Sequence, residues 1–117
     1  MTVEQFLDLI RSEESIEFEQ TMAVIDEHFD YTPTQFYNGK GEARVSNEAG
    51  QNGGSCKIFA FAQMQGLDQQ QTLRLFGRFY AEDVLLHPEG NDHANIRNFI
   101  RFGWEGIEFS GQALQPR

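Results

Sequence analysis

The stretch AGQNGGSCKIF, residues 49–59, marks the point where a glycine-rich loop gives way to an apolar segment. Three glycines precede Ser55, and the apolar residues continue to about Met64, shortly before Gly66. Serine accepts hydrogen bonds from the first backbone N–H groups of a helix, and glycine readily ends a helix in the left-handed conformation. The stretch therefore predicts an apolar helix that is capped by Ser55 and closed by Gly66.

Two helices are predicted before this stretch. Thr2 and Gln5 have the spacing of a capping box, in which each side chain bonds the backbone N–H of the other residue. A second helical pattern begins at Ser15 and ends before Pro33, because the residue that precedes a proline disfavours the helical region. Both patterns place apolar residues on one face, as helices that pack on a core do. In the second helix these residues are Phe18, Met22, Ile25 and Phe29.

Two further helices are predicted after this stretch. Asp68 and Gln71 form another capping box, and we expect Asn91 or Asp92 to cap the last helix, which follows the break HPEGN. Each segment has apolar residues at helical spacing. The fourth helix is lined by Leu73, Phe76, Tyr80 and Val84, and the fifth carries Ile96, Phe99 and Ile100.

Short strands complete the predicted fold. The segments TQFY and EARV flank Asn38, Gly39 and Gly41, which are residue types that turn hairpins. Ile107 and Phe109 alternate with polar neighbours in GIEFS, which predicts a short strand that pairs with this hairpin. We therefore expect a mostly α fold: a single compact domain over residues 1–117, with about five helices and a small β-hairpin or sheet.

Composition excludes several classes of partner. The chain has 18 acidic and 9 basic residues, so its formal net charge of -9 opposes contact with nucleic-acid phosphates and anionic lipids. No apolar run approaches the ~18 residues of a membrane span, and the first residues do not resemble a cleaved signal peptide. A single cysteine forms no internal disulfide, as in a reducing compartment. We expect a soluble protein with no nucleic-acid partner and no membrane span.

Cys56 is the first candidate for chemistry. A thiol in the first turn of a helix, beside Lys57, has surroundings that lower a cysteine pKa and favour the nucleophilic thiolate. His93 could then act as the base, with Asp92 or Asn95 orienting its imidazole. The alternative is that Cys56 packs in the core as a small apolar side chain, the commoner role of a free cysteine.

The glycine-rich turn is also a candidate ligand site. Backbone N–H groups of Gly53, Gly54 and Ser55 at a helix start, together with Lys57, would suit a small anion. The segment lacks the spacing of a P-loop, so nucleotide binding is not predicted. The alternative is that the glycines serve a turn that requires positive φ.

Acidic and histidine side chains gather on either side of Pro88, but without a recognised metal-ligand spacing. They are Glu82, Asp83, His87, Asp92 and His93. We interpret them as a solvated helix end, and predict neither a metal site nor a cofactor. Trp104 lies between Gly103 and Glu105, and it would be a candidate for binding a partner if it were exposed.

Four blocks of the chain resemble the HopJ family of bacterial type III effector proteins. They are YTPTQFYNG, NEAGQNGGSCKIFAFAQ, TLRLFGRFY and DHANIRNFIRFGWEGIEF, they follow the family's order, and they span most of the chain. The resemblance implies a protein of the bacterial cytoplasm that is delivered into host cells by a type III secretion system. It implies a host or bacterial protein as partner, and it supplies no reaction and no catalytic residues.

Overall fold

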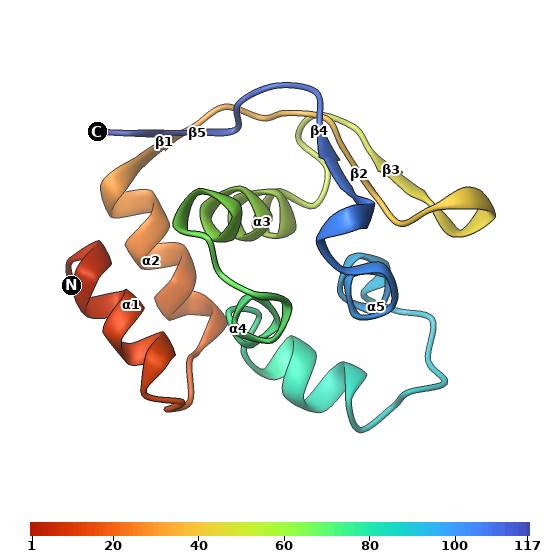
Figure 1. The fold of residues 1–117 in the computed structure, drawn as a ribbon, viewed down its shortest axis with the longest axis horizontal. Coiled ribbons are helices and arrows are strands. Elements are labelled where there is room, and N and C mark those ends of the chain that lie inside the picture. Colours follow the sequence, from red (N-terminus) through yellow and green to blue (C-terminus); the bar gives the residue numbers. More distant parts are fainter.

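The computed structural model describes all 117 residues as one domain in which the predicted apolar helix is central. This helix, α3 (Gly53–Gln65), buries six residues between Cys56 and Ala62, and it is apolar on nearly all sides. A helix with this pattern must be surrounded by other elements. Figure 1 shows α1 (Val3–Arg11) and α2 (Phe18–His28) on one side of α3, and α5 (Ala94–Phe102) on the other.

The strands form two small antiparallel sheets along one edge of the helices (Figure 1). In the larger sheet β2 (Phe36–Asn38) lies between β3 (Val45–Asn47) and β4 (Ile107–Phe109), with Phe36 opposite both Asn47 and Phe109. This confirms the predicted hairpin and its pairing with GIEFS. The second sheet pairs β1 (Phe29–Tyr31) with β5 (Leu114–Pro116), and the sequence did not predict it. The mostly α fold with a small sheet is thus confirmed.

Several helix ends differ from the prediction, although both capping boxes, at Thr2 with Gln5 and at Asp68 with Gln71, are confirmed. The helix α2 begins after Glu17, which forms its own capping box with Gln20, instead of at Ser15. It also ends earlier than predicted, because Phe29 already belongs to β1.

The predicted fourth helix is two elements, α4 (Gln69–Arg74) and a π-helix (Phe79–Val84), with a break at Gly77. Gly77 has a φ of +60°, and a Cβ at this position would lie 2.6 Å from the backbone nitrogen of Phe18. Only glycine fits such a position without strain. The break therefore follows from the close approach of this turn to the start of α2.

The core is built mainly from phenylalanine rings. Phe59 on α3 is fully buried and touches the rings of Phe36, Phe76, Phe99 and Trp104.

Two short 3-10 helices complete the chain, at Gly41–Ala43 and Gly103–Gly106. None of the helices combines the length and the apolar character that crossing a bilayer requires.

Candidate functional site

Three buried asparagines connect the larger sheet to α5. Asn47 and Asn95 form a reciprocal amide pair, with Asn95 Nδ2 donating to Asn47 Oδ1 at 2.8 Å and Asn47 Nδ2 donating to Asn95 Oδ1 at 3.1 Å. Asn38 Nδ2 donates to the backbone carbonyl of Asn95 at 2.8 Å and to its Oδ1 at 3.1 Å. Because buried amides must find partners, this network fixes the start of α5 against β2 and β3. The sequence did not predict this amide network.

The same network reaches the start of α3. Asn52 takes the left-handed conformation at the N-cap and directs its amide to Asn47, with Nδ2 2.7 Å from Asn47 Oδ1. Its backbone carbonyl accepts the N–H of Cys56 at 3.0 Å. Ser55 therefore lies inside the first turn of α3, and the prediction that it caps the helix is wrong. No side chain caps α3, and the N–H groups of Gly53, Gly54 and Ser55 find no acceptor in the chain.

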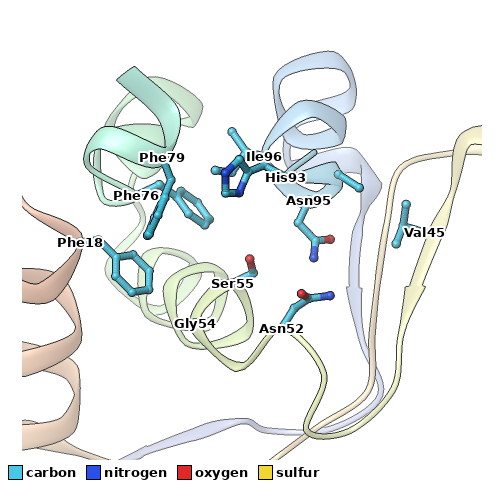
Figure 2. A pocket seen from close by; sticks show the side chains of 11 residues that line it. Phe18, Val45, Asn52, Gly54, Ser55, Phe76, Phe79, His93, Asn95 and Ile96 are labelled. Atoms are coloured by element: carbon cyan, nitrogen blue, oxygen red, sulfur yellow. The ribbon is translucent and has the colours of Figure 1, made fainter. Parts of the chain in front are cut away.

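A pocket of about 340 Å³ opens between the first turn of α3, the π-helix and the start of α5. We call it the His93 pocket. Figure 2 shows its phenylalanines on one side, its asparagines on the other, and the Ser55 hydroxyl pointing into the space between them. The residues that line it are Phe18, Val45, Asn52, Gly54, Ser55, Phe76, Phe79, His93, Ala94, Asn95 and Ile96.

His93 is the only ionisable residue that lines this pocket. It precedes α5 in the left-handed conformation, with a φ of 49°, which is uncommon for residues other than glycine. Its Nε2 lies 3.0 Å from Asp83 Oδ2 and 3.8 Å from Asp92 Oδ2, and its ring lies against Phe79 with centroids 5.3 Å apart. The carboxylate that orients His93 most closely is therefore Asp83 on the π-helix.

Asp92 and Asn95, the predicted orienting residues, have other principal partners. Asp92 Oδ1 accepts a hydrogen bond of 2.6 Å from Arg97 Nη2, and this bond lowers the pKa of Asp92. Arg97 also donates to the backbone carbonyls of Asp92 and His87, so it holds the loop before α5 in place. Asn95 belongs to the amide network and makes no hydrogen bond with His93.

Cys56 lies in the core and does not line the His93 pocket. Its side chain is 1 % exposed, and its Sγ is 3.6 Å from the carbonyl oxygen of Thr34. Burial raises the pKa of the Cys56 thiol, which opposes the thiolate that a nucleophile requires. No hydrogen bond joins Cys56 to His93, and Ser55 is the side chain of this turn that shares the pocket with His93.

We predict that Cys56 is protected from alkylation. In the folded chain its reaction with iodoacetamide at pH 7.5 should be at least about 100-fold slower than in urea, because only opened molecules expose the thiol. Since burial raises the pKa of the thiol, its rate should keep rising at pH values where a free thiol is already fully ionised and its rate has levelled off. Mass spectrometry of the modified chain measures both rates. Rapid alkylation of the folded chain, with a thiol pKa below the ordinary value, would instead support the hypothesis that Cys56 is a nucleophile.

The residues of the predicted anion site separate in the structure. Gly54 and Ser55 line the His93 pocket, whereas Lys57 Nζ pairs with Asp26 of α2 at 2.8 Å and lies 5.0 Å above the Tyr31 ring. A Cβ at Gly53 would lie 3.5 Å from Tyr31 Oη, so this glycine faces the same side as Lys57. The lysine therefore contributes its charge to the contact between α2 and α3.

The remaining candidates take structural positions. Trp104 is partly buried, donates from Nε1 to the carbonyl of Leu67 at 3.0 Å, and packs edge-on against Phe99. It is therefore not the exposed aromatic that a partner surface would need. No group of three or more histidine, cysteine, aspartate or glutamate side chains has a geometry that could hold a metal ion.

Comparison with known proteins assigns a family. A family model described as "HopJ type III effector protein" matches residues 3–114, which confirms the resemblance seen in the sequence. A search of curated proteins found no match. The crystal structure of the unknown function protein VPA0580 is 56% identical, with a TM-score of 0.95, and the match covers 100% of this chain and 95% of that chain. The fold is therefore shared with a protein for which no function is named.

Proposed function

Since the chain belongs to the HopJ type III effector protein family, we propose that it acts by binding a small ligand in the His93 pocket, either free or carried on a partner protein. The observation that carries the proposal is the make-up of this pocket. Binding sites are concave and mostly apolar, with a few well-placed polar groups. The pocket of about 340 Å³ has this make-up, and its volume suits a single ring or a single side chain.

The aromatic wall of the pocket would supply most of the binding energy. Phe18 and Phe79 meet edge to face with centroids 5.0 Å apart, and both remain partly exposed. Ile96 adds an aliphatic surface on the α5 side. Partly exposed rings that line a cavity gain apolar burial when a ligand covers them.

The polar wall is held rigidly, so its side chains lose little conformational entropy when a ligand binds. The amide pair of Asn47 and Asn95 joins β3 to α5, and Asn52 joins that pair to α3. Arg97 fixes the loop that carries His93. The groups that face the pocket are thus positioned by the fold before any ligand arrives.

The binding proposal predicts that simple aromatic compounds occupy the pocket. We expect at least one of benzamide, benzoate and benzylamine to shift the backbone amide resonances of Gly54, Ser55 and Ala94 in a nitrogen-15 NMR titration. The variant Ser55→Leu places an apolar side chain in the pocket and should weaken that binding at least about tenfold, since filling the cavity removes the ligand's space.

Gln63→Leu is the matched control, because it adds the same side chain on an exposed part of the same helix. It should bind as the unaltered chain does. Absence of shifts at the pocket with all three compounds, or equal binding by both variants, would contradict the proposal.

We also propose, from the family alone, that the protein is exported through a type III secretion system into host cells. A fusion of the full chain to an adenylate cyclase reporter tests this export. The host cells should accumulate cyclic AMP when the bacteria have an intact secretion system and not when its ATPase is deleted. Equal signals from both strains would count against export.

A further inference from the structure

The His93 pocket offers both acceptors and donors to a ligand, and this mixture restricts the chemistry of what binds there. His93 Nε2 lies 3.0 Å from a carboxylate oxygen of Asp83. A carboxylate oxygen has no proton to donate, so Nε2 carries the proton of this hydrogen bond. In the neutral imidazole Nδ1 is then a bare acceptor, and it makes no hydrogen bond within the chain.

Donors lie at the start of α3, across the pocket from the imidazole. The Ser55 hydroxyl points into the pocket in Figure 2 and makes no hydrogen bond with the chain. The backbone N–H groups of Gly54 and Ser55 also have no acceptor. The amide nitrogen of Asn52, by contrast, is engaged with Asn47. A ligand must therefore offer an acceptor toward α3 and a donor toward His93 to satisfy both walls.

Charge favours a neutral ligand over a charged one. No lysine or arginine lines the pocket, and the carboxylates of Asp83 and Asp92 lie against His93. The guanidinium of Arg97 is occupied by Asp92 and backbone carbonyls. An anion would thus be desolvated without a facing cation, in a chain whose net charge is -9. A cation would lack a free carboxylate inside the pocket.

We infer that the His93 pocket binds a neutral, flat ring that carries a primary amide or lactam, with its carbonyl toward Ser55 and its N–H toward His93 Nδ1. This inference rests on the proposed binding function and names the class of its ligand. The ring would lie against Phe18 and Phe79, whose edge-to-face arrangement leaves apolar surface on the pocket side. An amide meets the remaining requirement because it places a donor beside an acceptor without a charge.

The test compares four probes of similar size at pH 7.5 by nitrogen-15 NMR titration: benzamide, N,N-dimethylbenzamide, benzoate and benzylamine. Benzamide should bind at least about tenfold more tightly than the other three, because each of them leaves one wall of the pocket without a partner. N,N-dimethylbenzamide is the sharpest comparison, since it keeps the carbonyl and the ring and replaces both donor hydrogens by methyl groups.

The variant His93→Gly tests whether the imidazole accepts the hydrogen bond that the ligand's N–H donates. Glycine accepts the positive φ at this position, so the start of α5 is preserved. In this variant the preference for benzamide over N,N-dimethylbenzamide should disappear. A retained preference in His93→Gly, or tightest binding of benzoate, benzylamine or N,N-dimethylbenzamide, would overturn the assignment of the ligand class while leaving the binding function in place. Failure of all four probes to shift the pocket resonances would instead overturn the binding function itself.

Discussion

Replacing Phe59 by alanine is expected to lower the free energy of unfolding by about 3–5 kcal/mol, because a fully buried ring is removed and its neighbours close the cavity only in part. Phe59 contacts Phe99 and Phe76 with centroids 4.9 and 5.6 Å apart. A domain of this size is stable by about 5–15 kcal/mol, so the loss would be a large share of the total. Urea denaturation followed by circular dichroism measures it.

Two further variants identify the cause of this loss. Phe59→Leu leaves a smaller cavity, and we expect roughly half the effect of the alanine variant. Phe102→Ala removes the same ring from a partly exposed position on α5, where Arg101 lies 4.7 Å above it, and should cost less than Phe59→Ala. Equal losses for Phe59→Ala and Phe102→Ala would show that Phe59 is not the centre of the core.

Local contacts explain which parts of the fold could be predicted from the sequence. The capping boxes at Thr2 with Gln5 and at Asp68 with Gln71 involve residues three positions apart, so their spacing alone reveals them. The prediction that Ser55 caps α3 is wrong, because Asn52 occupies the N-cap. Asn52 does so in a left-handed conformation that the sequence pattern does not indicate. The sequence patterns therefore predicted which segments are helical more accurately than the residues at which each helix begins and ends.

Contacts between distant residues explain what could not be predicted. Gly77 interrupts the fourth helix because it packs on the backbone of Phe18, and nothing near Gly77 in the sequence indicates that approach. The pairing of β1 with β5 joins Tyr31 to Leu114, which lie more than half the chain apart. Loops of this length give no local signal of the strand pairing they close.

In the candidate site, too, some residues could be selected from the sequence, whereas their contacts could not. His93 was selected from sequence together with its neighbour Asp92, yet its closest carboxylate belongs to Asp83, ten residues earlier. Cys56 was selected for its place at a helix start, but the turn of the helix buries it and directs Ser55 into the pocket. Of the residues selected from the sequence, Gly54, Ser55, His93 and Asn95 thus line the pocket, whereas the direction of each side chain could be read only from the structure.

Removing the side chain of Asn95 should destabilise the fold and loosen the polar wall of the His93 pocket. Asn95→Ala deletes three buried hydrogen bonds, two accepted by Oδ1 and one donated by Nδ2, at about 1 kcal/mol each, so we expect a loss of about 3 kcal/mol. Asn91→Ala removes an exposed amide without partners and should change stability by less than about 0.5 kcal/mol. Urea denaturation compares the two.

The same pair of variants separates the structural role of the amide network from its role in binding. The Asn47 amide loses its short bonds to Asn95, and only the 3.4 Å contact with the carbonyl of Phe36 remains for its Nδ2. Asn52 depends on Asn47 for its position, so the start of α3 should become more mobile. Faster hydrogen exchange of the Cys56 amide, which donates to the carbonyl of Asn52, would reveal this change. Benzamide should then bind Asn95→Ala more weakly than Asn91→Ala, since a mobile wall must be ordered when the ligand enters. Unchanged exchange at the Cys56 amide would mean that α3 keeps its place without the network.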